Sequence, residues 1–116
     1  MSDLVDLAIE DRDGVVVAQV RGELDIAGAS RTGDAIAEAV PTTARGLVVD
    51  FSGLDFMDSS GVAMLFTLAR RLGRRRQQLR VVSPDGGPVT RVLDIVDFGR
   101  AAPVVGELEQ ALADFG

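Results

Sequence analysis

The segment Leu47–Phe51 constrains the fold of this chain more than any other feature of its sequence. It reads Leu-Val-Val-Asp-Phe, and a short, nearly all-apolar run of this kind is typical of a central strand covered on both faces. Before it lies a helical stretch in which Ala29, Ile36 and Val40 fall on one face, and Pro41 prevents its continuation. A strand reached through a helix requires parallel pairing in the sheet. The segment therefore predicts an α/β domain in which helices pack on a sheet.

Strands and helices alternate along the rest of the predicted chain. Leu4–Ile9 and Val15–Val20, joined by the turn residues Asp11–Gly14, indicate an N-terminal antiparallel hairpin. The later elements are a helix over Gly61–Leu72 with Gly73 as its C-cap, a strand over Gln78–Val82, a short helix over Val89–Val96, a short strand over Pro103–Val105 and a terminal helix over Glu107–Ala113. We expect one domain, residues 1–116, with a mixed sheet and packed helices.

The composition argues against several functional classes. The chain has no Cys and no His, which removes disulfides, thiol and imidazole catalysis and nearly all zinc sites. A net charge of −6 argues against nucleic acid as the main ligand. No Gly-rich phosphate loop is present, since Gly86-Gly87 is followed by Pro88, which lacks a backbone donor. We expect no enzymatic activity and no cofactor. Without a long apolar run or a basic leader, we also expect a cytoplasmic protein without membrane contact.

The basic residues include one cluster: Arg70, Arg71, Arg74, Arg75 and Arg76. Cations at a helix C-terminus complement the helix dipole, and this interpretation is favoured. A site for phosphate or for a protein partner is the alternative.

The run Asp58-Ser59-Ser60-Gly61 carries the functional information. It lies between an apolar strand and an amphipathic helix, so it places two hydroxyls at a helix N-terminus. Taken alone, it is more often a helix cap, for which Ser and Asp are preferred. The alternative is a phosphorylation site, where a phosphoserine would bring about −1.5 to −2 charges.

Three segments together resemble the anti-sigma factor antagonist family, whose fold is the STAS domain. They are Arg21–Asp25 (Arg-Gly-Glu-Leu-Asp), Leu47–Gly61 with its Phe-Met-Asp-Ser-Ser-Gly end, and Arg91–Phe98. Most of the chain is covered, although Val62-Ala63 stands where relatives often have Leu-Gly. The resemblance implies a partner switch. The unphosphorylated antagonist binds an anti-sigma factor that is also a serine kinase and so frees a sigma factor. Phosphorylation ends the interaction until a serine phosphatase reverses it.

The resemblance also implies roles for individual residues. It assigns phosphorylation to Ser59 and partner binding to the surface of Asp25, Asp58, Ser59, Ser60 and Gly61. Ser60 takes a supporting role as a helix cap. For Asp25, a turn or capping carboxylate is an equally good interpretation. We expect a monomer. The main alternative function is a STAS accessory subunit that binds the ATPase of a membrane transporter, in which case Ser59 is a contact and not a phosphorylation site.

Overall fold

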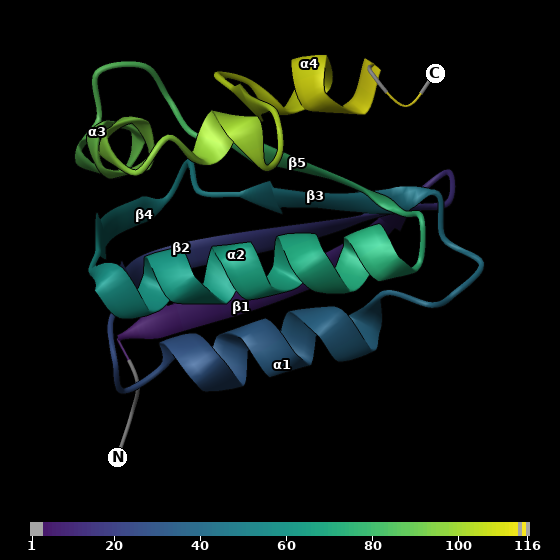
Figure 1. Ribbon diagram of the computed structural model, residues 1–116, viewed down its shortest axis with the longest axis horizontal. Helices are drawn as coiled ribbons and strands as arrows, with labels where there is room; N and C mark the ends of the chain where they lie inside the picture. The colour runs from purple at the N-terminus through teal and green to yellow at the C-terminus, as the bar shows by residue number, and fades with distance from the viewer. Residues whose placement is uncertain (1–3, 114, 116) are drawn as a thin grey trace.

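The structure is a computed structural model that describes residues 4–113 and 115. Its strands form a sheet in the order β1-β2-β3-β5-β6, and β4 pairs with the C-terminal end of β2. In chain order the elements are β1 (Val5–Arg12), β2 (Val15–Leu24), α1 (Ala29–Ala39), β3 (Gly46–Asp50), β4 (Leu54–Met57), α2 (Ser59–Arg74), β5 (Gln78–Val82), α3 (Pro88–Ile95), the 3-10 helix η1 (Phe98–Arg100), β6 (Val104–Val105) and α4 (Leu108–Ala113). The predicted fold class, a mixed sheet with packed helices, is confirmed (Figure 1).

The N-terminal hairpin is longer than the sequence pattern predicts. β1 continues to Arg12 and pairs antiparallel with β2 along its whole length. Only Asp13 and Gly14 remain as the turn, and both have positive φ, at 54° and 85°. A two-residue loop with positive φ at both positions matches the twist of the flanking strands. The polar residues Asp11 and Arg12 therefore lie in the strand and not in the turn.

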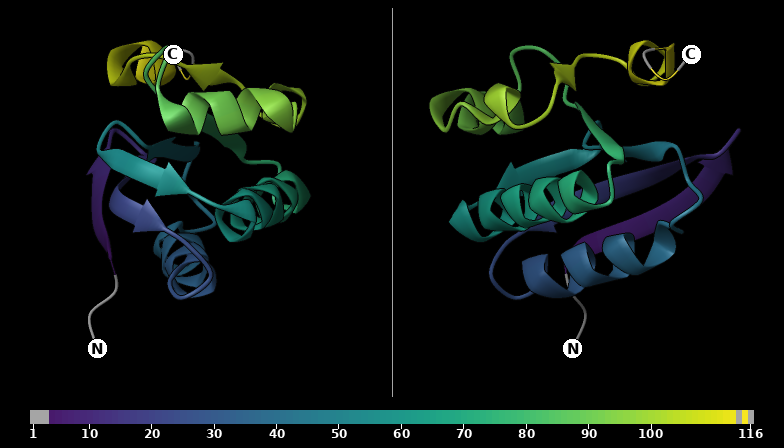
Figure 2. Two further views of the ribbon diagram at one scale, coloured as in Figure 1. Left: turned by 90° about the vertical axis from the view of Figure 1, so that its left-hand side faces the viewer. Right: turned by 45° about the vertical axis from the view of Figure 1, so that its right-hand side comes forward.

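The central strand is β3, as its apolar sequence predicts. It pairs parallel with β2 on one side and with β5 on the other, and all five of its residues are buried. On one face of the sheet, side chains such as Val49 pack in a core with residues of α1, α2 and α3. On the other face, Val48 packs with Ala111 and Phe115 from the C-terminal segment. The turned views show α1 and α2 side by side against the sheet (Figure 2).

The end of β2 pairs with a strand, β4, that the predicted elements do not include. β2 pairs with β3 through residues 15–19, and then with β4 through residues 22–24, with a register shift between Gly22 and Glu23. Gly22 has a φ of 95°, and its N–H donates to the Gly53 carbonyl at 3.0 Å. β1 occupies the other edge of β2 as far as Gly22, so β4 continues along the same edge of β2 as β3, and the shift leaves Asp55 of β4 without a register partner on β2. β2 and β4 end side by side, and each leads into a helix.

The helix α2 ends differently from the prediction. Gly73 is not the C-cap, because the helix continues through Arg74. The chain turns at Arg76, whose φ is 59° and whose N–H donates to the Gly73 carbonyl at 3.1 Å. The Gln77 side-chain amide then bonds the carbonyls of Pro41 and Ala44, which fastens this turn to the loop before β3. Of the Arg cluster, Arg71 and Arg74 lie in the last turn of the helix, where they complement its dipole.

Among residues 4–113 and 115, we find no helix with the length and apolar character needed to span a membrane.

Candidate functional site

Two neighbouring parallel strand ends form the framework of the candidate site. Leu24 of β2 is the register partner of Met57 of β4, and the Asp58 N–H donates to the Leu24 carbonyl at 3.2 Å. Asp25 and Asp58 are the residues that directly follow this pair. Because adjacent strands are about 4.8 Å apart, the two acidic residues emerge side by side at one edge of the sheet. The structure thus brings together two segments that lie more than thirty residues apart in the sequence.

Asp58 caps the helix α2. Its backbone is extended, with φ −101° and ψ −170°. Its carboxylate oxygen Oδ1 accepts hydrogen bonds from the Ser60 N–H at 2.8 Å and the Gly61 N–H at 3.4 Å. The capping role expected for Ser60 is therefore wrong: the helix begins at Ser59, two residues before the predicted Gly61, so Ser60 lies inside its first turn. The negative charge of Asp58 also interacts favourably with the positive end of the helix dipole.

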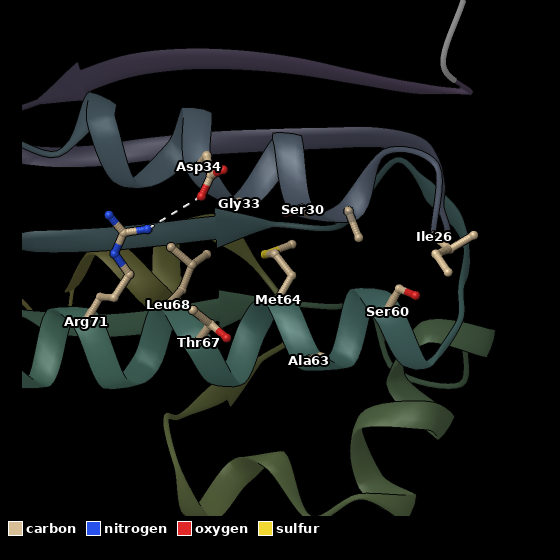
Figure 3. Close-up of a pocket in the computed structure, with 11 residues that line it drawn as sticks. Ile26, Ser30, Gly33, Asp34, Ser60, Ala63, Met64, Thr67, Leu68 and Arg71 are labelled. Atoms are coloured by element: carbon tan, nitrogen blue, oxygen red, sulfur yellow. Dashed lines mark ion pairs between the residues drawn. The ribbon is translucent and has the colours of Figure 1, made fainter.

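The two serines of the segment differ in their surroundings. Ser59 is exposed, whereas Ser60 is half-buried. Within the described residues, the Ser59 hydroxyl makes no hydrogen bond. Ser60 lines a groove between α1 and α2, near Ile26 (Figure 3). Of the two serines, Ser59 is therefore the more accessible to another protein.

Gly61 allows the start of α2 to lie close to the strand ends. It is buried, and a Cβ atom at this position would lie 2.6 Å from Met57 Cγ and 3.2 Å from Leu24 Cδ2. Contacts this short require neighbouring atoms to move. Gly61 is one of the residues for which a partner contact was predicted, and in this structure it has a packing role.

Asp25 shapes the turn that enters α1. Its carboxylate accepts a hydrogen bond from the Ala27 N–H at 3.0 Å, and its carbonyl accepts from the Ala29 N–H at 2.8 Å. These bonds fit the turn interpretation of Asp25, and its place beside Asp58 is also compatible with a partner contact. The turn holds Ile26 in solvent, with 82% of its surface exposed. Sequence reasoning missed Ile26, since only its isolation between polar and small residues could have indicated exposure.

The described residues contain no group of three or more His, Cys, Asp or Glu side chains placed to hold a metal ion. The chemistry available at this site is that of one accessible hydroxyl, two carboxylates and a capped helix end.

Removal of the Asp58 carboxylate is expected to destabilise the fold measurably. Asp58→Ala leaves the Ser60 and Gly61 N–H groups without their acceptor, and loss of such a cap costs about 0.5–2 kcal/mol. Asp58→Asn retains an acceptor oxygen and is expected to lose less than half of that. Urea denaturation monitored by circular dichroism gives both free energies of unfolding. Equal losses in the two variants would mean that the charge, and not the hydrogen bonds, stabilises the helix start.

The sequence and the fold of this chain are similar to those of STAS domains and anti-sigma factor antagonists. The family model of the STAS domain matches residues 6–111. RsfA of Mycobacterium tuberculosis, an anti-sigma-F factor antagonist, is 35% identical over 115 residues, which cover 97% of this chain and 89% of RsfA. The crystal structure of an anti-sigma factor antagonist from Mycobacterium paratuberculosis superposes with a TM-score of 0.86 at 28% identity, covering 96% of this chain and 93% of that one. Unphosphorylated SpoIIAA, also an anti-sigma factor antagonist, shares the fold, with a TM-score of 0.71 at 24% identity over 94% of this chain and 96% of that one.

Proposed function

This chain belongs to the anti-sigma factor antagonist family of STAS domains, and we propose that its unphosphorylated form binds an anti-sigma factor with serine kinase activity. Binding would release the sigma factor held by that protein. The observation that carries the proposal is the contrast at the start of α2, where Ser59 is exposed, with no hydrogen bond from its hydroxyl to another described residue, and Ser60 is half-buried and lines a groove. A kinase that docks on this end of the molecule would meet Ser59 first.

Phosphorylation of Ser59 would end the interaction through charge. The N–H groups of Ser60 and Gly61, which would otherwise attract a phosphate, are already bonded to the Asp58 carboxylate. The phosphate would therefore stay on the surface beside Asp58, with Asp25 on the neighbouring strand end. Like charges brought together in an interface cost several kcal/mol, and each 1.4 kcal/mol is a factor of ten in affinity. No change of fold is needed for this switch.

The same exposure would let a serine phosphatase restore the active form. In this proposal Asp25 and Asp58 set the charge of the docking surface, Ser60 contributes to its edge, and Gly61 keeps the helix start close to the strand ends. The solved structures of SpoIIAA include an unphosphorylated and a phosphorylated form, which supports a phosphorylation switch on this fold.

Ser59→Ala is expected to fold, to bind the anti-sigma factor and to resist phosphorylation. The substitution removes the hydroxyl that would accept the phosphate, and it breaks no hydrogen bond found among the described residues. Ser60→Ala is the matched control and is expected to accept phosphate as wild type does. The anti-sigma factor is first captured from native cells with wild-type bait, identified by mass spectrometry and purified. Phosphate incorporation is then measured with that kinase and ATP. Near-stoichiometric phosphorylation of Ser59→Ala would show that the assignment is wrong.

The capture step also tests the function itself. Wild-type bait is expected to retain a kinase-type anti-sigma factor that a Ser59→Glu bait loses. Retention of a transporter ATPase by both baits alike would replace the partner switch with the accessory-subunit function.

A further inference from the structure

The helices α1 and α2 enclose an open groove, of which the proposed partner switch involves only Ser60, at one end. We call it the α1–α2 groove. Its volume is about 310 Å³, and its lining is mainly apolar. Ile26, Ala29, Gly33, Ser60, Ala63 and Met64 are among the lining residues (Figure 3).

Small side chains on both helices create this space. At the closest approach, a Cβ on Gly33 would lie 2.5 Å from Met64 Cγ, so α1 and α2 touch there through a glycine. Ala29 of α1 and Ala63 of α2 also line the groove, and their small side chains leave space next to Met64. An apolar trough that remains open between two packed helices can receive side chains from another molecule.

The two ends of the groove differ in chemistry. At one end lie Ser60, which follows the proposed phosphorylation site, and the exposed Ile26, which follows Asp25. The groove is therefore continuous with the surface proposed to bind the anti-sigma factor. At the other end lies Arg71, eleven residues further along α2, or about 16 Å at 1.5 Å per residue.

At this end of the groove, Arg71 is available to a second carboxylate. Arg71 Nη1 and Asp34 Oδ1 are 3.7 Å apart, with side chains 38% and 67% exposed. An exposed ion pair of this length contributes little to stability, so a carboxylate from outside can compete for it. Arg74, one turn beyond, is exposed and has no carboxylate partner in the described part of the chain. Arg71 is the member of the Arg cluster among the residues that line the groove, and Asp34 lines the same end.

We propose that the α1–α2 groove receives an amphipathic helix of the anti-sigma factor, with apolar side chains over Ala63 and Met64 and a carboxylate at Arg71. The inference rests on the proposed function and adds a determinant of partner choice outside the Ser59 surface. The walls are helices whose backbone groups are bonded internally, so an extended segment would find no backbone partners there. A helix satisfies its own backbone and binds through its side chains. Complementary charge at the distal end would fix its direction.

The test uses two substitutions in the groove and a control for each. Ala63→Phe fills the groove from an exposed position on α2, and Ala35→Phe makes the same change at an exposed position of α1 outside it. Arg71→Glu reverses the distal charge. Arg12→Glu makes the same charge change at a side chain of similar exposure, 41%, that is also ion-paired at 3.7 Å, to Glu109. Dissociation constants for the purified anti-sigma factor are measured by titration calorimetry, and folding is checked by thermal denaturation.

We expect Ala63→Phe and Arg71→Glu to weaken binding tenfold or more, with both controls within twofold of wild type. If wild type binds, Ser59→Asp does not, and both groove variants bind like wild type, then the groove proposal is wrong and the partner switch stands. If wild type binds no anti-sigma factor, the proposed function itself fails. Sedimentation velocity shows whether the wild type self-associates. If a groove variant abolishes that self-association and leaves binding to the anti-sigma factor unchanged, the groove belongs to a contact with a second copy of this chain.

Discussion

Ser59→Asp is expected to lower the affinity for the anti-sigma factor by about 100-fold or more and to leave the thermal midpoint nearly unchanged. A 100-fold loss corresponds to about 2.8 kcal/mol, which is within the cost of placing like charges together in an interface. The fold should tolerate the change, because Ser59 is exposed at the first position of α2, where a negative charge is favourable by about 0.3–1 kcal/mol. Calorimetric titration gives the affinity, and thermal denaturation gives the midpoint.

Ser59→Asn is the matched control for this experiment, since it has the shape of Asp without its charge. It is expected to bind within about threefold of wild type. Equal losses for Ser59→Asp and Ser59→Asn would mean that the site excludes the larger side chain and does not respond to charge. A midpoint lowered by the Asp variant alone would instead assign Ser59 a structural role. The loss caused by Asp should also shrink at high salt, because exposed charges are screened.

The sequence predicted those parts of the fold that depend on local pattern. The apolar run at Leu47–Phe51 identified the central strand, and the turn residues before Val15 identified the hairpin. β4 could not be predicted in this way, because Leu54–Met57 is only four residues long and has just two buried side chains. Its strand conformation depends on pairing with β2, and that pairing begins only at Gly22, where the register shifts. Long-range pairing of this kind leaves no periodic signal in the short segment itself.

The sequence predicted which residues form the candidate site better than it predicted how they are arranged. The segment Asp58–Gly61 pointed to a helix start with an accessible hydroxyl, and Ser59 is exposed there. The family resemblance gave Ser60 the role of helix cap. Ser and Asp are both preferred caps, and only the helix boundary decides between Ser60 and Asp58. The groove was missed because its walls come from α1 and α2, and the spacing between two helices is a tertiary property.

Gly22→Ala is expected to destabilise the protein by several kcal/mol, because Gly22, at the register shift between β2 and β4, has a backbone conformation and a close neighbour that a side chain does not allow. Gly22 has a φ of 95°, and a Cβ there would lie 2.0 Å from the Leu4 carbonyl oxygen. A left-handed conformation costs other residues about 1–2 kcal/mol, and overpacking typically adds 1–3 kcal/mol. The Leu4 carbonyl cannot simply withdraw, because it accepts a hydrogen bond from the Glu23 N–H at 2.8 Å. The thermal midpoint should fall by on the order of 10 °C or more.

Gly73→Ala is the control that separates this effect from a general cost of replacing glycine. Gly73 lies in the last turn of α2, and a Cβ there meets no atom within 4 Å. Its replacement is expected to stabilise the protein by about 0.5–1 kcal/mol, because Ala is the better helix former. The two variants should therefore shift the midpoint in opposite directions. If Gly22→Ala instead retained the wild-type midpoint, a glycine at the register shift would not be needed for the fold. The alignment of Asp25 beside Asp58 would then have to depend on the pairing of Leu24 with Met57 alone.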